Sequence, residues 1–206
     1  MEQTKQKGLF IVFEGIDGSG STTQADEIGN ILNSRGVSTH ITREPTDSLI
    51  GGLIRSLLRG HWSLTPEGLQ LLFAADRAHH LKTEVIPILE KGVNVMSDRY
   101  YFSSIAYGSV DISDDKFISD INRLFPEPDL VIYLRVSASE AMRRIQAGRH
   151  TETELFEKEQ QLSMVVAAYD NLAKERDYFV SIDGMMPREK VTEAIIKVLQ
   201  DRFNLG

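Results

Sequence analysis

The sequence contains no cysteine among its 206 residues. This absence excludes disulfide bonds, thiolate metal sites and cysteine nucleophiles, and it is compatible with the cytoplasm, where we expect the protein to work. Basic residues are also in deficit, because 23 lysines and arginines face 30 aspartates and glutamates, which leaves a net charge of −7. We therefore expect neither a general nucleic-acid surface nor a membrane-binding surface, although a local basic pocket is compatible with this balance.

Long apolar runs and linkers are missing as well. The first apolar run, Leu9 to Phe13, has only five residues, which is too short for a signal peptide or a membrane span. There is no internal repeat, low-complexity tract or Pro/Gly/Ser-rich linker. With 41% apolar and 26% charged residues, the composition is that of an ordinary globular protein. We expect one domain over residues 1–206.

Short apolar segments alternate with amphipathic ones along the chain. We expect strands at 9–13, 37–42, 93–96, 130–134 and 178–182, the continuous apolar runs among them being typical of strands buried on both faces. One of the intervening helices begins near Pro66, turns Leu69, Leu72 and Phe73 inward, and is kinked or broken at Pro87. The alternation predicts an α/β fold with a parallel sheet between two helical layers, and ligands at the carboxyl ends of its strands.

A glycine-rich turn follows the first expected strand. Residues 13–24, F-E-G-I-D-G-S-G-S-T-T-Q, match the phosphate-binding pattern G-x-x-x-x-G-K-[ST] at Gly15, Gly20 and Thr22, but Ser21 occupies the lysine position. A dinucleotide-binding pattern is the weaker alternative, since it requires glycine where Thr23 stands; a tight turn without a ligand is another. The interpretation that we favour assigns the nucleotide phosphates to the loop residues Gly15, Ile16, Asp17, Gly18, Ser19, Gly20, Ser21 and Thr22.

The missing lysine has a predictable cost. A charge-assisted contact to the outer phosphates contributes roughly 1.5–3 kcal/mol, so its loss weakens ATP binding or slows transfer by about ten- to a few-hundredfold. Loop amides, Mg²⁺ and arginines elsewhere are able to offset part of this loss. We expect a raised KM for ATP or a lowered kcat relative to proteins that keep the lysine.

Five segments together resemble the thymidylate kinases, a family of P-loop nucleoside-monophosphate kinases. They are the loop at 13–24, T-R-E-P at 42–45, L-L-F-A-A-D-R-A at 71–78, D-R-Y-Y-F-S-S-I-A-Y at 98–107 and A-M-R-R-I-Q-A-G-R-H at 141–150. The resemblance implies a three-layer αβα P-loop kinase fold with a five-stranded parallel sheet and a flexible lid over about 143–154. It also implies a homodimer that transfers the γ-phosphoryl group of Mg²⁺-ATP to dTMP, giving dTDP and ADP.

The resemblance also assigns the residues that bind dTMP. Phe73 would stack on the thymine, Arg77 would hydrogen-bond its edge, and Tyr107 would pack against the deoxyribose. Without the resemblance, Phe73 is better explained as a core residue and the arginines as surface residues. The full set implied for dTMP is Asp17 at the 3′-hydroxyl, Arg55 and Arg99 at the acceptor phosphate with Glu44 nearby, Phe73, Arg77, Tyr107, and Ser103 and Ser104 beside the base.

The resemblance also implies which residues provide charge at the reacting phosphoryl group. Asp98, at the end of an expected strand, is suited to bind Mg²⁺ through water, and Thr22 offers it a hydroxyl. Arg149 is the first candidate for the charge over the transferred group, with Arg143 and Arg144 behind it. Phosphoryl transfer depends mainly on positioning and charge neutralisation, which is the chemistry that such a set performs.

The sequence departs from the family pattern at three places and leaves three hypotheses. Ser21 replaces the lysine, Gly108 stands where many members have a glutamine that reaches the base, and Thr46-Asp47 stands where bacterial members often have Gly-Gly. The chain is an active dTMP kinase, a kinase with another or broader deoxynucleoside monophosphate acceptor, or a non-catalytic nucleotide-binding protein. The first is favoured, because the charged residues that the family needs are otherwise present.

Overall fold

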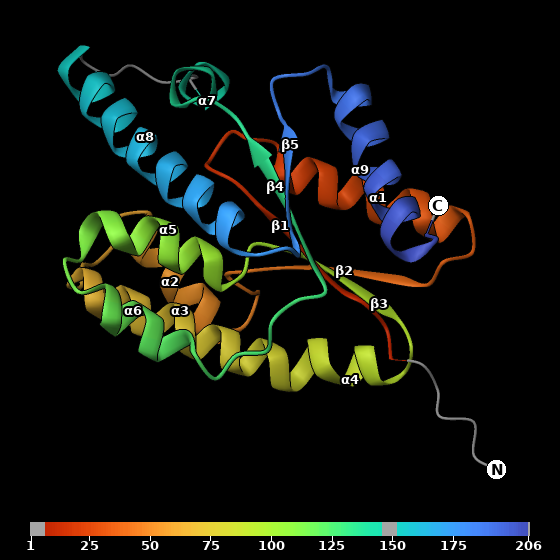
Figure 1. Cartoon of the computed structure of the whole chain (residues 1–206). Helices are drawn as coiled ribbons and strands as arrows, with labels where there is room; N and C mark the ends of the chain where they lie inside the picture. Colours follow the sequence, from red (N-terminus) through yellow and green to blue (C-terminus); the bar gives the residue numbers. More distant parts are fainter. Residues whose placement is uncertain (1–6, 146–151, 206) are drawn as a thin grey trace.

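A five-stranded, all-parallel sheet forms the centre of the computed structural model, which describes residues 7–145 and 152–205 (Figure 1). The strand order is β2-β3-β1-β4-β5. The strands are β1 (Phe10–Glu14), β2 (Thr39–Arg43), β3 (Asn94–Asp98), β4 (Leu130–Arg135) and β5 (Phe179–Asp183). Each lies within two residues of its expected start, and the predicted α/β fold with a parallel sheet is confirmed.

Helices cover both faces of this sheet (Figure 1). Ile11 and Phe13 of β1 point to the face covered by the first and last helices, whereas Phe10 and Val12 point to the opposite face. This alternation follows from the two-residue period of a strand and explains the uninterrupted apolar runs. The helices are α1 (Ser21–Ser34), α2 (Leu49–Leu58), α3 (Pro66–His80), α4 (Ile86–Glu90), α5 (Tyr101–Asp111), α6 (Asp115–Asn122), α7 (Ala138–Ile145), α8 (Glu152–Glu175) and α9 (Arg188–Phe203), with a π-helical turn η1 (Leu81–Val85) joining α3 to α4.

The side chains that α3 buries differ from those predicted from the sequence. Leu69, Leu72 and Phe73 are only half-buried. The buried positions of α3 are polar, namely Gln70, Asp76, Arg77 and His80. The apolar stripe is therefore only partly buried, because α3 faces a cavity, lined by Leu69 and Phe73, and a hydrogen-bonded network rather than a purely apolar core.

The segment also widens before Pro87. The π-helical turn η1 lies directly ahead of α4, in which Pro87 occupies the first turn. Proline has no backbone N–H to give to the preceding turn, and a wider turn accommodates this loss without ending the helical path. Within residues 7–145 and 152–205, no helix is long and apolar enough to cross a membrane.

Candidate active site

Three segments meet at the carboxyl ends of β1, β2 and β3. The backbone N–H of Arg99, just after β3, donates to the Phe13 carbonyl at 2.8 Å, and that of Glu44, just after β2, donates to the Asp98 carbonyl at 3.0 Å. The sheet ladder therefore extends one residue further and fixes the start of each loop. This edge holds the glycine loop, the Glu44-Pro45 segment and the Asp98-Arg99 pair, as parallel-sheet topology predicts.

The glycine loop between β1 and α1 bends in a way that only glycine adopts without strain. Gly18 and Gly20 have φ of 80° and 95°, which lie in the left-handed region. Gly20 is the N-cap of α1 and provides no side chain to cap the helix. The first N–H groups of α1 have no acceptor within the helix and carry the positive end of its dipole. This geometry suits an anionic ligand.

The first two hydroxyl side chains of α1 point to Asp98. Ser21 Oγ donates to Asp98 Oδ1 at 2.9 Å, and Thr22 Oγ1 donates to Asp98 Oδ2 at 2.5 Å. Ser21 is buried, so the residue in the lysine position binds the carboxylate of the neighbouring strand. Hydroxyl and carboxylate oxygens are the ligands that Mg²⁺ prefers, usually together with water and substrate phosphates. The described residues contain no group of three or more His, Cys, Asp or Glu side chains that could hold a metal ion.

A cavity of about 240 Å³ opens beside the glycine loop, between α3 and α5. Its wall combines the Phe73 ring with the charged groups of Arg77, Arg99 and Asp17. Eight of the nine residues implied for dTMP binding line it, namely Asp17, Glu44, Phe73, Arg77, Arg99, Ser103, Ser104 and Tyr107. An aromatic surface with a few convergent polar groups is the composition of a small-molecule site.

Arg99 links the cavity to the glycine loop. Its Nη2 lies 2.5 Å from Asp17 Oδ1, its Nη1 donates to Ser103 Oγ at 3.0 Å, and its guanidinium lies 5.6 Å from the centre of the Tyr107 ring. The Asp17 N–H donates to the Tyr107 hydroxyl at 3.0 Å. Arg99 itself has φ of 75°, a strained conformation for a non-glycine residue that is common at functional sites. The loop residue and the cavity residues therefore form one connected unit.

Arg77 lies at the buried end of the cavity and is held on several sides. Its Nε donates to Glu44 Oε2 at 2.9 Å, its Nη1 donates to Asn122 Oδ1 at 2.6 Å, and its Nη2 donates to Ser104 Oγ at 3.3 Å. The side chain of Arg77 is 1% exposed. A guanidinium with three fixed partners cannot change rotamer freely, so its remaining donors have a fixed direction.

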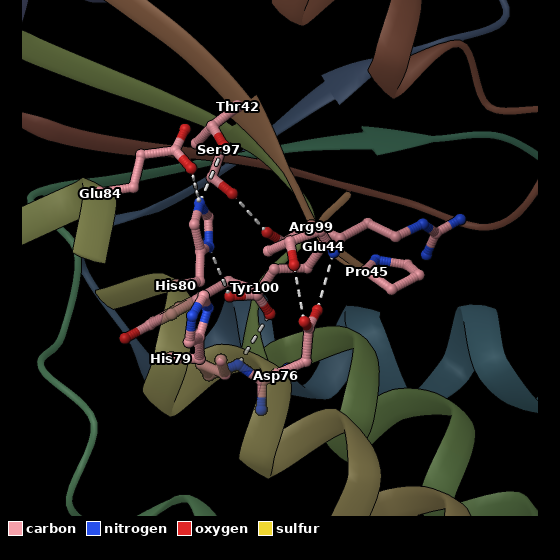
Figure 2. A network of polar contacts seen from close by, with 12 residues as sticks. Thr42, Glu44, Pro45, Asp76, His79, His80, Glu84, Ser97, Arg99 and Tyr100 are labelled. Atoms are coloured by element: carbon pink, nitrogen blue, oxygen red, sulfur yellow. Dashed lines mark hydrogen bonds and ion pairs between the residues drawn. The ribbon is translucent and has the colours of Figure 1, made fainter. Parts of the chain in front are cut away.

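Glu44 is in turn held by a buried histidine (Figure 2). His80 Nδ1 lies 3.1 Å from Glu44 Oε1, and His80 Nε2 lies 2.8 Å from Thr42 Oγ1. Asp76 accepts hydrogen bonds from the backbone and hydroxyl of Thr46, which anchors the loop after Glu44 to α3. The network therefore holds Glu44 and the loop that follows it to a single helix, α3.

Glu14, the last residue of β1, is fully buried beneath the site. Its Oε1 accepts from the N–H groups of Tyr100 and Ser103, and its Oε2 accepts from the hydroxyls of Ser103 and Tyr169 at 2.6 and 2.7 Å. Burial raises the pKa of Glu14 to about 7, although Arg99 and these hydrogen bonds oppose the rise.

Comparison with known proteins agrees with this geometry. A family profile described as thymidylate kinase matches residues 13–195. A probable thymidylate kinase from Methanococcus aeolicus is 41% identical over 199 residues, which cover 94% of this chain and 96% of the relative. Probable thymidylate kinases from Methanocaldococcus jannaschii and Pyrococcus horikoshii are 39% and 37% identical, with at least 91% of both chains covered in each case. The chain belongs to the thymidylate kinase family.

Among the nine residues that the resemblance implies for dTMP binding, Arg55 is the one that does not line the cavity. Its Nη1 donates to the carbonyls of Pro45 and Thr46 at 3.1 and 2.5 Å, and its Nη2 lies 3.4 Å from Asp47 Oδ1. In this arrangement Arg55 fastens the loop after β2. A role at the acceptor phosphate requires its side chain to leave these carbonyls.

The arginines assigned to the lid are paired or lie outside the described residues. Arg143 and Arg144 both donate to the Glu140 carboxylate, at 2.7 and 2.8 Å. Their hydrogen bonds lower the pKa of Glu140 to about 2. Arg144 also donates to the Gly18, Ser19 and Gly184 carbonyls, at 3.4, 3.3 and 2.9 Å, so it anchors the glycine loop to the turn after β5. Arg149, the first candidate, lies outside the described residues.

Two further site residues were not predicted from the sequence. Neither His80 nor Gln70 belongs to a motif assigned from the sequence, yet both are buried on α3, as Arg77 is. For Gln70, the spacing along the helix could have indicated its place in the site. Gln70 precedes Phe73 by three residues and Arg77 by seven, which places the three on one helical face.

Proposed function

We propose that this chain is a thymidylate kinase that transfers the γ-phosphoryl group of ATP to dTMP, giving dTDP and ADP. The observation that supports this most directly is the cavity between α3 and α5, which joins the glycine loop through the ion pair of Asp17 and Arg99. A nucleotide bound at the loop and a nucleoside monophosphate bound in the cavity would have their phosphates close together. Such proximity supplies much of the catalysis of phosphoryl transfer.

Each wall of the cavity matches one part of dTMP. The Phe73 ring provides a stacking surface for the base, and Arg77 provides donors for a base carbonyl. Tyr107 and Asp17 would contact the sugar, and Arg99 would provide the charge for the acceptor phosphate. Arg99 would exchange its contact with Asp17 for one with the phosphate, which is a stronger bidentate acceptor.

The nucleotide side of the site depends on the glycine loop, Thr22 and Asp98. Loop N–H groups would hold the ATP phosphates, and the Thr22 hydroxyl and Asp98 carboxylate would hold Mg²⁺, partly through water. The metal would supply positive charge at the phosphate oxygens. We expect turnover to require a divalent cation, so that EDTA abolishes ADP release and excess Mg²⁺ restores it.

A lid arginine would provide the charge that the lysine provides in other phosphate-binding loops. Arg149 is the first choice, because Arg143 and Arg144 already pair with Glu140. Arg149→Ala should lower kcat by the equivalent of about 2–4 kcal/mol. Arg35→Ala, at an exposed position after α1, is the matched control. A change in kcat below twofold for Arg149→Ala would exclude this role.

The decisive experiment measures ADP release from Mg²⁺-ATP with dTMP, dUMP, dCMP, dGMP, dAMP or UMP as acceptor. Turnover confined to dTMP supports the proposed function, and turnover with several acceptors supports a broader kinase. Phe73→Ala should raise the KM for dTMP, and an unchanged value would return Phe73 to a packing role. No turnover with any acceptor, together with measurable nucleotide binding, would identify a binding protein.

We also propose that the protein works in the cytoplasm as a homodimer. Large apolar side chains are exposed on the neighbouring helices α2 and α3, where Leu49, Leu53 and Leu71 are 92%, 50% and 52% exposed. Monomeric proteins rarely expose so much apolar surface in one region, and a second copy of the chain is the partner that the resemblance implies.

A further inference from the structure

Gln70 is a buried polar residue that has no part in the catalytic and binding roles proposed above. Its side chain belongs to the cavity wall, on the face of α3 that also carries Phe73 and Arg77. Only 5% of Gln70 is exposed. A glutamine at such a depth normally has hydrogen-bond partners for both ends of its carboxamide.

The oxygen of this carboxamide has none. Within the described part of the chain, Gln70 Oε1 is buried and has no hydrogen-bond partner. Leaving a buried acceptor without a donor destabilises the folded protein, whereas methionine at the same place would fill the space without this cost. Unpartnered buried groups in a ligand cavity are explained when the ligand supplies the missing partner.

The neighbouring helix leaves room for this carboxamide. A Cβ atom at Gly108 of α5 would lie 3.3 Å from Gln70 Nε2 and 3.4 Å from Gln70 Cδ, and 2.5 Å from Ile118 Cδ1. Any side chain at residue 108 would therefore displace either Gln70 or Ile118. The two positions fit together as a pair, a glycine on α5 that admits a long polar side chain from α3.

The chemistry of a pyrimidine edge indicates what this group does. Thymine and uracil present a carbonyl oxygen at O4 and an N–H donor at N3, whereas cytosine presents an amino donor and an acceptor nitrogen at these places. The Arg77 guanidinium has only donors, so it matches the carbonyl. The N3–H requires an acceptor, and both oxygens of Glu44 are already bound to Arg77 and His80.

We propose that Gln70 determines base specificity, its carboxamide oxygen accepting the N3–H of a 4-oxopyrimidine while Arg77 donates to O4. The terminal torsion of glutamine is broad, so the carboxamide is able to present its oxygen to the cavity that Gln70 lines. This pairing distinguishes thymine and uracil from cytosine. The inference rests on the proposed thymidylate kinase activity and adds one residue that determines its base specificity.

The test compares Gln70→Met, Gln70→Glu and the control Gln200→Met, which makes the same change at an exposed position of α9. Gln70→Met should raise the KM for dTMP about tenfold and reduce the preference for dTMP over dCMP by a similar factor, since a site built to hydrogen-bond its substrate loses discrimination when the bond is removed. Its kcat and its KM for ATP should change less than twofold. Gln70→Glu keeps an acceptor oxygen in the same place and should retain most of the preference.

Thermal unfolding separates this role from a structural one. Gln70→Met removes the unpartnered oxygen at a similar volume, so its Tm should equal or exceed that of the wild type. An unchanged KM for dTMP at such a Tm, or a lowered Tm with KM raised equally for dTMP and ATP, would overturn the inference. If the wild type turns over no dTMP, the proposed function fails separately. Calorimetric binding of dTMP to the same three variants then decides the role of Gln70.

Discussion

Ser21 shows how one residue changes the charge distribution of a phosphate-binding loop. Its hydroxyl donates to Asp98 and Ser21 is buried, so the residue in the lysine position carries no charge and binds a carboxylate instead. Asp98 receives hydroxyl donors from both Ser21 and Thr22 at the N-terminus of α1. The loop therefore keeps its acidic partner in place while it lacks its own cation.

Ser21→Lys tests the consequence of this exchange. An ammonium group at residue 21 would restore a charge-assisted contact worth roughly 1.5–3 kcal/mol, so kcat/KM for ATP should rise by about tenfold or more. Steady-state kinetics with dTMP saturating measure this value. Ser21→Ala is the matched control, since it removes the hydrogen bond to Asp98 without adding charge and should give no gain. Equal kcat/KM values for the wild type and Ser21→Lys would mean that the loop is already fully compensated.

Glu14 connects two elements that are far apart in the sequence. It ends β1, yet it accepts from the N–H groups of Tyr100 and Ser103 at the start of α5. Tyr100, the N-cap of α5, provides no side-chain cap of its own. The carboxylate therefore takes the place of a local cap, and it fixes the helix that carries Ser103 and Tyr107 into the cavity.

The raised pKa of Glu14 makes this cap sensitive to pH. The unfolded chain loses the Glu14 proton near its ordinary pKa of 4.5, whereas the folded protein keeps it until about pH 7. Between these values the folded state binds the extra proton, so the free energy of unfolding falls as pH rises. The shift corresponds to roughly 3 kcal/mol, which is fully present below pH 4.5 and lost above pH 7.

Urea unfolding from pH 4.5 to 8 measures this effect. The free energy of unfolding of the wild type, minus that of Glu14→Gln, should decrease by up to about 3 kcal/mol across the range, because glutamine does not titrate. Glu189→Gln, at an exposed position of α9, should leave the wild-type profile unchanged. A difference between wild type and Glu14→Gln that stays constant with pH would show that folding does not raise the pKa of Glu14.

The sequence predicted the elements of this fold better than the faces that they bury. Continuous apolar runs located the strands, because strands buried on both faces contain little else. The same reasoning failed for α3, where Arg77 and His80 are buried. Their partners come from β2, α5 and α6, at separations of 27 to 45 residues for Arg77. Helical periodicity describes one element alone, so it cannot show that distant donors and acceptors will satisfy a buried charge.

Within the candidate site, the sequence could indicate the place of those residues that directly follow a strand. Parallel topology brings such ends to one edge, which accounts for Asp17, Glu44 and Arg99. Arg55 belongs to a helix, and its direction depends on the loop carbonyls that it binds. The orientation of Arg55 therefore follows from tertiary contacts that the motif does not contain.

At the scale of the whole molecule, α2 and α3 contribute differently from the other helices. They form part of the wall of the cavity between α3 and α5, and they also present Leu49, Leu53 and Leu71 to solvent. If these leucines form the interface of the proposed symmetric dimer, each substitution removes two copies of the side chain from it, one in each subunit. Burial of one leucine contributes about 1.5–3 kcal/mol, so a pair of leucines on α2 is sufficient to control association.

Replacing Leu49 and Leu53 together by aspartate tests this interface. Four leucines would be lost per dimer, so the dissociation constant should rise more than a hundredfold. Light scattering after size-exclusion chromatography at micromolar concentration should show the wild type at twice the chain mass and the variant at the chain mass. Met164→Asp on α8, where the native side chain is 48% exposed, is the matched control and should stay dimeric. A monomeric wild type would contradict the homodimer, whereas a dimeric double variant would place the interface elsewhere. Since both leucines are at least half exposed in the single chain, an unchanged Tm of the monomeric variant would show that the substitutions act on association and not on folding.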